Sequence, residues 1–177
     1  MNQPMELSNE LKEQLCVSNW NTPEFTLNGM LLHGKIVYVY DGDTVHVVLN
    51  LNNKLTKFIC RLNGIDTPEI CPKNITDIDL RKKQIESAIK SRNYLIERLT
   101  DQQIDKTKNK LTKKDIKDIC DKSKKIVLIK CMQFDKYGRL LVEIFVDNNT
   151  TCSINDDMVT NNYAYIYNGK TKETFVA

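Results

Sequence analysis

Three short segments of the sequence place acidic and basic residues where they could act together on a phosphodiester. They are residues 41–44 (DGDT), Arg61 with residues 66–69 (DTPE), and residues 135–139 (DKYGR). Carboxylate oxygens are hard ligands that suit Ca²⁺ or Mg²⁺. A planar guanidinium binds phosphate through two hydrogen bonds and stays charged at any working pH. A divalent ion, two arginines and a further carboxylate together supply what this hydrolysis requires.

Each segment also has an ordinary structural explanation. DGD is a common hairpin turn, DTPE can begin a helix, and DKYGR can be a turn between strands. The combination favours a site, because the pairing of consecutive strands would bring Asp43 and Asp66 to one end of a sheet. Asp41, Asp43, Asp66 and Glu69 would then crowd together, and close carboxylates repel unless a cation lies between them. The spacing is not that of an EF-hand loop.

The elements that must position these residues begin with a three-stranded meander over residues 34–65. The run from Lys35 is rich in β-branched and aromatic residues, and alternation after DGD puts Val45, Val47 and Leu49 on one face. Asn52-Asn53 is a plausible tight turn. His46 alternates with these valines, so we expect it to point to solvent, and we assign it no chemistry.

Helices and two more strands follow the meander. An apolar stripe predicts a helix over residues 80–99, and Thr112 with Asp115 predicts a second, short helix. Residues 125–134 and 139–146 are the fourth and fifth strands, and Ser153 with Asp156 caps a last helix. The order β-β-β-α-(α)-β-β-α predicts an α+β, mainly β fold: a five-stranded OB barrel with flanking helices, an architecture that often binds oligonucleotides.

Composition bounds the interpretation further. The 177 residues are enough for one domain with a real core. Net charge is +3, but residues 81–130 carry 16 basic and 7 acidic side chains, which indicates either a polyanion partner or a solvated helix face. No apolar run reaches the ~18 residues of a membrane span and no secretory signal is visible, so we expect a soluble, intracellular monomer. The six cysteines form no C-x-x-C pair, which argues against a zinc site, and without a secretory signal we expect no disulfide framework.

The segments D-G-D-T, R-L-x-G-I-D-T-P-E and D-K-Y-G-R, in this order, resemble the staphylococcal nuclease (thermonuclease) family over roughly residues 33–168. The resemblance implies a Ca²⁺-dependent endonuclease that hydrolyses DNA, with RNA as a further substrate, and leaves 3′-phosphates. Mg²⁺ or another divalent ion is an alternative cofactor. A non-catalytic nucleic-acid or protein-interaction module on the same barrel is the alternative function, although such a module has no need of Glu69 with both arginines.

The resemblance also implies a role for each motif residue. Asp43 and Asp66 would bind Ca²⁺ through their side chains and Thr67 through its carbonyl, with Asp41 acting from close by or through water. Glu69 would be the general base or would position the attacking water. The remaining roles belong to basic and aromatic residues: phosphate binding and transition-state stabilisation by Arg61 and Arg139, and contact with a neighbouring phosphate by Lys136 and Tyr137.

The chain departs from the family pattern in several places. Residues 1–28 are an N-terminal appendage with a possible short helix capped by Ser8, and residues 29–177 form the nuclease domain. About twenty residues, 102–122, which include seven lysines, are inserted before the fourth strand, and they either track phosphates or form a solvated excursion. Asn162 replaces a glycine, which requires a positive φ. Three tyrosines near the C-terminus could stack on bases or pack in the protein: Tyr163, Tyr165 and Tyr167.

Overall fold

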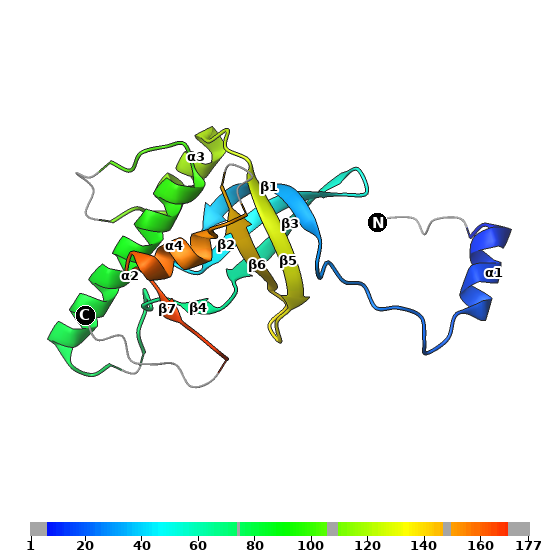
Figure 1. Ribbon diagram of the computed structural model, residues 1–177, viewed down its shortest axis with the longest axis horizontal. Helices are drawn as coiled ribbons and strands as arrows, with labels where there is room; N and C mark the ends of the chain where they lie inside the picture. Colours follow the sequence, from blue (N-terminus) through cyan, green and yellow to red (C-terminus); the bar gives the residue numbers. More distant parts are fainter. Residues whose placement is uncertain (1–6, 74, 106–109, 147–149, 170–177) are drawn as a thin grey trace.

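Five strands close into a barrel in the computed structural model, which describes residues 7–73, 75–105, 110–146 and 150–169 (Figure 1). The order around the barrel is β1-β2-β3-β6-β5, in which β3 and β6 are parallel and the other pairs antiparallel. The strands are β1 (Leu31–Val39), β2 (Thr44–Leu51), β3 (Lys54–Leu62), β5 (Val127–Phe134) and β6 (Leu140–Phe145). This mixed, closed barrel with its helices confirms the predicted OB-like α+β fold.

The period-two alternation of β2 fills the barrel interior. Val45, Val47 and Leu49 are completely buried, and Cys60 and Cys131 join them as small apolar side chains. Burial of each large apolar side chain contributes roughly 1.5–3 kcal/mol to folding. The core therefore forms a rigid frame on which the strand ends and turns present the motif residues.

Two turns have the backbone that the sequence requires. Asn52 and Asn53 both have positive φ (49° and 62°) and join β2 to β3 in register. Asn162 also has a positive φ of 60°, as the replacement of glycine demands. β1, however, begins at Leu31 and not at Lys35, because its first residues pair with β5, a partner almost a hundred residues away.

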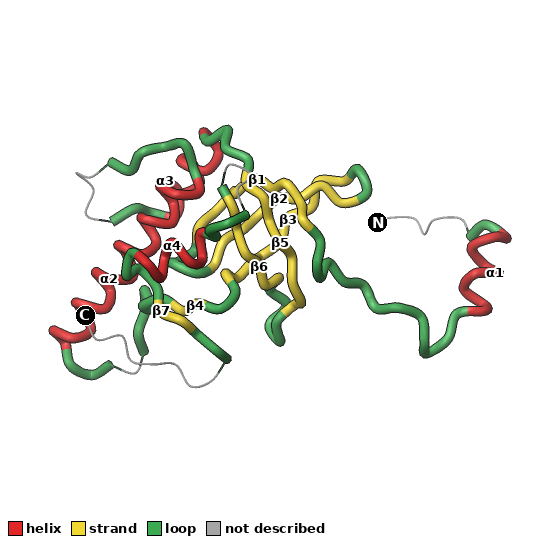
Figure 2. Tube along the Cα trace, viewed as in Figure 1, coloured by secondary structure: helices red, strands yellow, loops and turns green. Residues whose placement is uncertain are grey.

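Helix α2 (Ile78–Leu99) lies against the barrel and is the longest helix of the described chain (Figures 1 and 2). It begins two residues before the predicted start, because the Asp77 side chain accepts a hydrogen bond from the Leu80 amide and caps the helix. Its buried face includes Leu95, Ile96 and Leu99. The predicted apolar stripe is therefore largely correct.

The basic insertion contains helix α3 (Lys113–Lys122), which packs on β1. Thr112 and Asp115 form the predicted capping box, and Ile116 and Cys120 are buried beneath the helix. This part of the insertion is thus a fixed layer on the barrel and no solvated excursion. Lys106 and Lys108 of the insertion lie outside the described residues.

The C-terminal part adds helix α4 (Ile154–Thr160), whose Ser153–Asp156 capping box was also predicted. A two-stranded sheet of β4 (Ile65–Asp66) and β7 (Tyr165–Ile166) was not predicted, because strands of two residues leave no periodic pattern.

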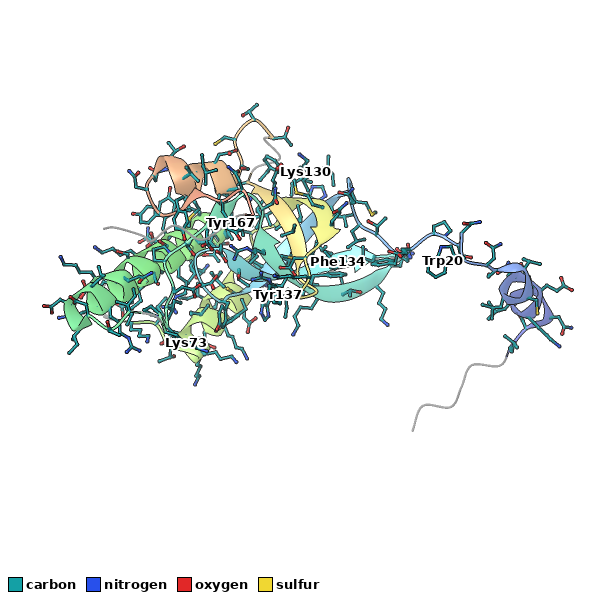
Figure 3. The ribbon with its side chains drawn as sticks, turned by 90° about the horizontal axis from the view of Figure 1, so that it is seen from below. Trp20, Lys73, Lys130, Phe134, Tyr137 and Tyr167 are labelled. Atoms are coloured by element: carbon teal, nitrogen blue, oxygen red, sulfur yellow. The ribbon has the colours of Figure 1, made fainter. Side chains whose placement is uncertain are left out.

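Helix α1 (Asn9–Val17) is capped by Ser8, has no buried residue and stands apart from the barrel (Figure 1). Trp20 is 99% exposed on the segment that leads from α1 to the barrel (Figure 3). Within the described ranges, the structure contains no helix with the length and apolarity needed to cross a membrane.

Candidate active site

The turn between β1 and β2 presents the first two acidic residues. The Asp43 amide donates a hydrogen bond to Asp41 Oδ1 (3.1 Å), and the Leu62 amide donates to the Asp43 carbonyl (2.8 Å). The second bond ties the start of β2 to the end of β3. Asp43 is therefore buried at the end of the barrel, while Asp41 remains half-exposed.

Arg61 joins the first motif to the second. Its Nη1 lies 2.7 Å from Asp43 Oδ1 and its Nη2 lies 2.7 Å from Asp66 Oδ1. Nη2 also donates to the carbonyl of Ile65 at 3.2 Å. Asp43 and Asp66 do meet at one end of the barrel, as strand pairing predicted, but they lie on either side of a guanidinium group.

The charge of this cluster is not balanced by Arg61 alone. Burial and the nearby charge of Asp41 raise the pKa of Asp43 to about 8, an effect that the ion pair with Arg61 and the hydrogen bond from Thr44 only partly offset. The guanidinium is held by opposite charges that outweigh its own desolvation and raise its pKa. One guanidinium thus bridges two carboxylates beside a third, an arrangement that favours an additional cation.

Asp66 is held from its other side by Tyr165. The Tyr165 hydroxyl donates to Asp66 Oδ2 at 2.6 Å, and Asp66 has no exposed surface. Burial and this bond to an acidic group raise the pKa of Tyr165. Sequence reasoning considered Tyr165 only for stacking or packing. The pairing of β4 with β7 places the two residues opposite each other. No pattern in the sequence indicates this pairing, so the role of Tyr165 could not be predicted.

The third motif is a tight turn organised by Asp135. Asp135 Oδ1 accepts hydrogen bonds from the amides of Tyr137 and Arg139, and Oδ2 lies 2.7 Å from Arg139 Nη2. Gly138 has a φ of 78°, which only glycine adopts easily. The exposed ring of Tyr137 lies 5.1 Å from Lys136 Nζ and 5.5 Å from the Arg139 guanidinium carbon. Asp135 therefore fixes the direction of Arg139.

A cavity of about 820 Å³ brings the three motifs together. Eight of the nine residues that the sequence singled out line it: Asp41, Asp43, Arg61, Thr67, Glu69, Lys136, Tyr137 and Arg139. The ninth, Asp66, lies behind the wall, with each carboxylate oxygen hydrogen-bonded to another side chain. Tyr167 also lines the cavity, so a role in base stacking is open to it, whereas Tyr163 stacks on Tyr94 with ring centres 4.0 Å apart.

Gly42 allows the first two motifs to approach each other closely. A Cβ atom at Gly42 would lie 2.8 to 2.9 Å from side-chain atoms of Thr67, which is itself buried. Contacts this short do not occur between ordinary side chains, so any other residue would push the two loops apart. The glycine of the DGD segment therefore allows the close approach to Thr67, in addition to its place in the turn between β1 and β2.

The donor chemistry of the cluster fits a hard divalent cation, because its candidate ligands are carboxylate and carbonyl oxygens. In the ranges that the structure covers, however, no three Asp, Glu, His or Cys side chains converge closely enough to form a metal centre by themselves. Arg61 occupies the space between Asp43 and Asp66. A cation at this site would share those carboxylates with the guanidinium.

Comparison with known proteins gives the family of the chain. The family model described as staphylococcal nuclease homologue matches residues 59–175. The chain belongs to this family. The matched range includes the second and third motifs and begins after Asp41 and Asp43.

A curated relative from Methanocaldococcus jannaschii, described as an uncharacterized protein, is 30% identical over 162 residues. The alignment covers 81% of this chain and 64% of the relative. The chain therefore spans somewhat less than two thirds of that relative's length.

Proposed function

We propose that this member of the staphylococcal nuclease family is a Ca²⁺-dependent endonuclease that hydrolyses DNA or RNA and leaves 3′-phosphates. The observation that carries the proposal is the joint lining of one cavity by Arg61, Glu69 and Arg139 beside a cluster of carboxylates. A module that only binds nucleic acid has no need to assemble these groups.

Two arginines would bind the scissile phosphate. Arg139 reaches the cavity from the third motif, where the Asp135 carboxylate fixes its direction. Arg61 approaches from β3 and is held in place by two carboxylates. Two guanidinium groups from different segments of the chain can bind two phosphate oxygens and neutralise the charge that develops as the bond to phosphorus breaks. Lys136 and Tyr137 would contact the adjoining phosphate.

Glu69 is suited to act on water. It lines the cavity and is exposed, whereas Asp43 and Asp66 are buried. A carboxylate in this position can accept a proton from the attacking water or hold that water in line. Asp41, Asp43, Asp66 and the Thr67 carbonyl would hold Ca²⁺, which would supply positive charge at the phosphate.

The decisive experiment is a cleavage assay on purified protein. Plasmid DNA, linear single-stranded DNA and RNA are incubated with Ca²⁺, Mg²⁺ or EDTA, and product ends are identified by phosphatase-sensitive labelling. We expect cleavage with Ca²⁺, none in EDTA, and 3′-phosphate ends. Binding without cleavage under every condition would instead establish the non-catalytic module, and full activity in EDTA would remove the metal from the proposal.

A further inference from the structure

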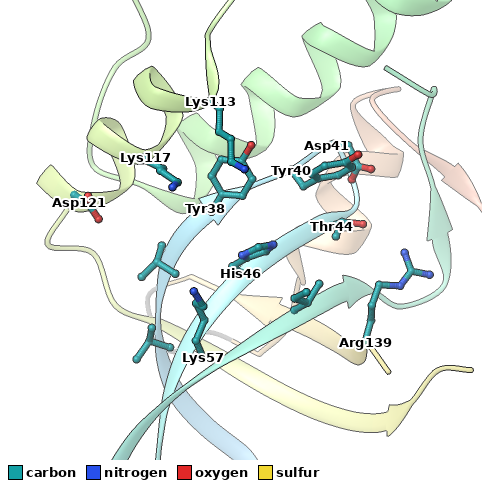
Figure 4. A pocket seen from close by; sticks show the side chains of 13 residues that line it. Tyr38, Tyr40, Asp41, Thr44, His46, Lys57, Lys113, Lys117, Asp121 and Arg139 are labelled. Carbon is teal, nitrogen blue, oxygen red and sulfur yellow. The ribbon is translucent and has the colours of Figure 1, made fainter. Parts of the chain in front are cut away.

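A second cavity, of about 910 Å³, adjoins the candidate active site. Its floor is the outer face of β1, β2 and β3, which contribute Tyr38, His46 and Lys57. Its wall is α3, which contributes Lys113 and Lys117. Figure 4 shows these two lysines reaching from α3 toward Tyr38, above His46 and Lys57. His46 was expected to face solvent, but it is half-buried in this cavity, with its ring edge-on to that of Tyr38 at 5.2 Å.

Positive charge is concentrated around His46. Burial lowers its pKa, and the charges of Lys57, Lys113 and Lys117 lower it further. Three lysines from two separate elements therefore act on one imidazole. The acidic residues of the lining are Asp41, at the candidate active site, and Asp121 on α3. The space bordered by the three lysines therefore carries a positive potential, which favours an anion.

The two cavities share part of their walls. Tyr40, Asp41 and Arg139 line both, so a chain bound at the active site could continue into the second cavity without leaving the surface. Tyr40 is 59% exposed at this junction and offers the face or edge of its ring to a ligand.

Helix α3 holds its lysines in fixed positions. Ile116 and Cys120 anchor the helix on the barrel, and Lys35 Nζ donates a hydrogen bond to the Asp121 carbonyl at 3.3 Å. The capping box fixes the first turn, which carries Lys113. Lys117 lies one turn further along the same face. Lys114 and Lys122 are exposed like these two lysines, but they do not line the cavity.

We propose that the second cavity binds a single-stranded segment of the substrate next to the cleaved bond, with backbone phosphates on Lys57, Lys113 and Lys117. The proposal rests on the proposed function, since it extends the same substrate path. A single strand is favoured over a duplex because aromatic rings such as Tyr40 stack on bases only when those bases are unpaired and unstacked. Helix α3, part of the insertion, would thus lengthen the binding site of the barrel.

The test is binding of a fluorescent single-stranded oligonucleotide of twelve thymidines, measured by anisotropy across a salt series in EDTA. The variant Lys113→Gln/Lys117→Gln is compared with Lys114→Gln/Lys122→Gln, which removes the same charge from the same helix outside the cavity. Each phosphate contact with a single strand contributes about 0.7 to the slope of log affinity against log salt. We expect the cavity variant to lower the slope by about 1.4, and the affinity by roughly 20-fold at 0.1 M salt, relative to the control variant.

Two results would overturn the proposal. Equal weakening in both variants would mean that the lysines act only through net charge, and an equal loss on a hairpin duplex would mean that the cavity does not select a single strand. His46 gives an independent readout, because the sequence contains two histidines, whose ring protons can be followed by proton NMR. A bound phosphate backbone should raise the pKa of His46, and an unchanged pKa on saturation would place the strand elsewhere.

Cleavage of a dinucleotide substrate, too short to reach α3, separates this proposal from the proposed function. We expect equal rates for the wild type and both variants. If the wild type cleaves but the two variants bind long oligonucleotides alike, only the second cavity loses its role. If neither the wild type nor the variants cleave, but the two variants still differ in oligonucleotide binding, the second cavity retains its role and the catalytic proposal fails.

Discussion

Arg61 lies between Asp43 and Asp66, with one terminal nitrogen 2.7 Å from each carboxylate. The arginine expected to bind phosphate is thus bonded to the two residues expected to bind Ca²⁺. Substrate and cation would both compete with this bridge. The strength of the bridge would therefore affect both the stability of the free protein and its affinity for either proposed ligand.

The first prediction concerns the replacement Arg61→Lys. An ammonium group cannot reach two carboxylates in the geometry of a guanidinium fork, so one buried charge loses its partner. At about pH 9, where Asp43 is ionised, we expect a loss of about 3–5 kcal/mol in the free energy of unfolding, measured by urea denaturation, together with loss of cleavage. Ca²⁺ should raise the melting temperature of the variant more than that of the wild type, because the cation can pair with the carboxylate that the ammonium group does not reach.

Arg98→Lys is the matched control for that variant. Arg98 also pairs with a carboxylate, Asp157, but its side chain is 48% exposed. Exposed pairs contribute about 0–1 kcal/mol, so stability and cleavage should barely change. An Arg61→Lys protein as stable as this control would show that the bridge contributes little.

The second prediction concerns pH. The pKa of Asp43 is raised to about 8 in the folded protein, whereas an Asp in an unfolded chain has a pKa of about 3.9. Between these values the folded state binds the additional proton, so the contribution of Asp43 to stability falls as pH rises from about 4 to about 8. A bound cation favours the ionised carboxylate and opposes this loss. The increase in melting temperature caused by Ca²⁺ should therefore grow from pH 5 to pH 8.

Asp43→Asn is the control in this pH series, since an amide does not titrate. We expect Asp43→Asn to lose the part of the pH-dependent stability that Asp43 contributes. It should also lose most of the increase in melting temperature caused by Ca²⁺. A Ca²⁺ shift in the wild type that is the same at pH 5 and pH 8 would argue against Asp43 as a ligand.

Local sequence signals predicted much of the fold, and they failed where the structure depends on partners that are distant in the chain. The capping boxes at Thr112 and Ser153 and the alternation around Val47 depend on neighbouring residues, and all were predicted. The early start of β1 depends on β5, and the pairing of β4 with β7 spans about a hundred residues. Long-range contacts of this kind leave no periodicity in either segment.

The candidate site shows the same division. The motifs predicted which residues meet, because each motif sits at a strand end that the barrel brings to one edge. They did not predict which hydrogen-bond partners each side chain has. The burial of Asp66 behind Arg61 and Tyr165, and the position of His46 beneath α3, follow from elements that are far apart in sequence.

The third prediction assigns the chemical step to Glu69. Glu69→Gln keeps the size of the side chain and removes its ability to accept a proton. We expect the rate constant for cleavage at saturating substrate to fall by roughly 10²–10⁴-fold, with nucleic-acid binding retained. Glu86→Gln, an exposed change on α2, is the control. Single-turnover measurements separate the chemical step from product release, and a wild-type rate for Glu69→Gln would exclude the residue from it.

The fourth prediction tests the contact between Gly42 and Thr67. In Gly42→Ala the added methyl group meets the buried Thr67 side chain at less than 3 Å, so one of the two loops must move. We expect a cost of about 1–3 kcal/mol in stability and a large loss of activity. Thr67→Ser removes the methyl group that lies 2.8 Å from the new Cβ, so adding it to Gly42→Ala should restore part of both. If the stability change of the double variant equals the sum of the two single changes, the clash is relieved elsewhere in the structure.

The fifth prediction concerns the hydroxyl of Tyr165, which donates to Asp66 Oδ2 at 2.6 Å. Tyr165→Phe keeps the ring and removes this bond, leaving one oxygen of a fully buried carboxylate without that donor. Hydrogen bonds to charged groups contribute about 1.5–3 kcal/mol, and we expect a loss of stability in that range. Cleavage should also fall, because Asp66 is then held in position by fewer bonds.

A structural effect of Tyr165→Phe can be separated from a positioning effect. Tyr163→Phe, two residues away, keeps the ring that stacks on Tyr94 and should change neither stability nor cleavage by much. If Tyr165 acts through Asp66, the apparent Ca²⁺ affinity of Tyr165→Phe changes together with cleavage, and in an Asp66→Asn background the same substitution has no further effect on either. If Tyr165 only stabilises the fold, stability falls while the Ca²⁺ affinity and the rate at saturating Ca²⁺ stay at wild-type values. Calcium titrations of the wild type, Tyr165→Phe, Asp66→Asn and the double variant, followed by thermal melting and by cleavage, distinguish these outcomes.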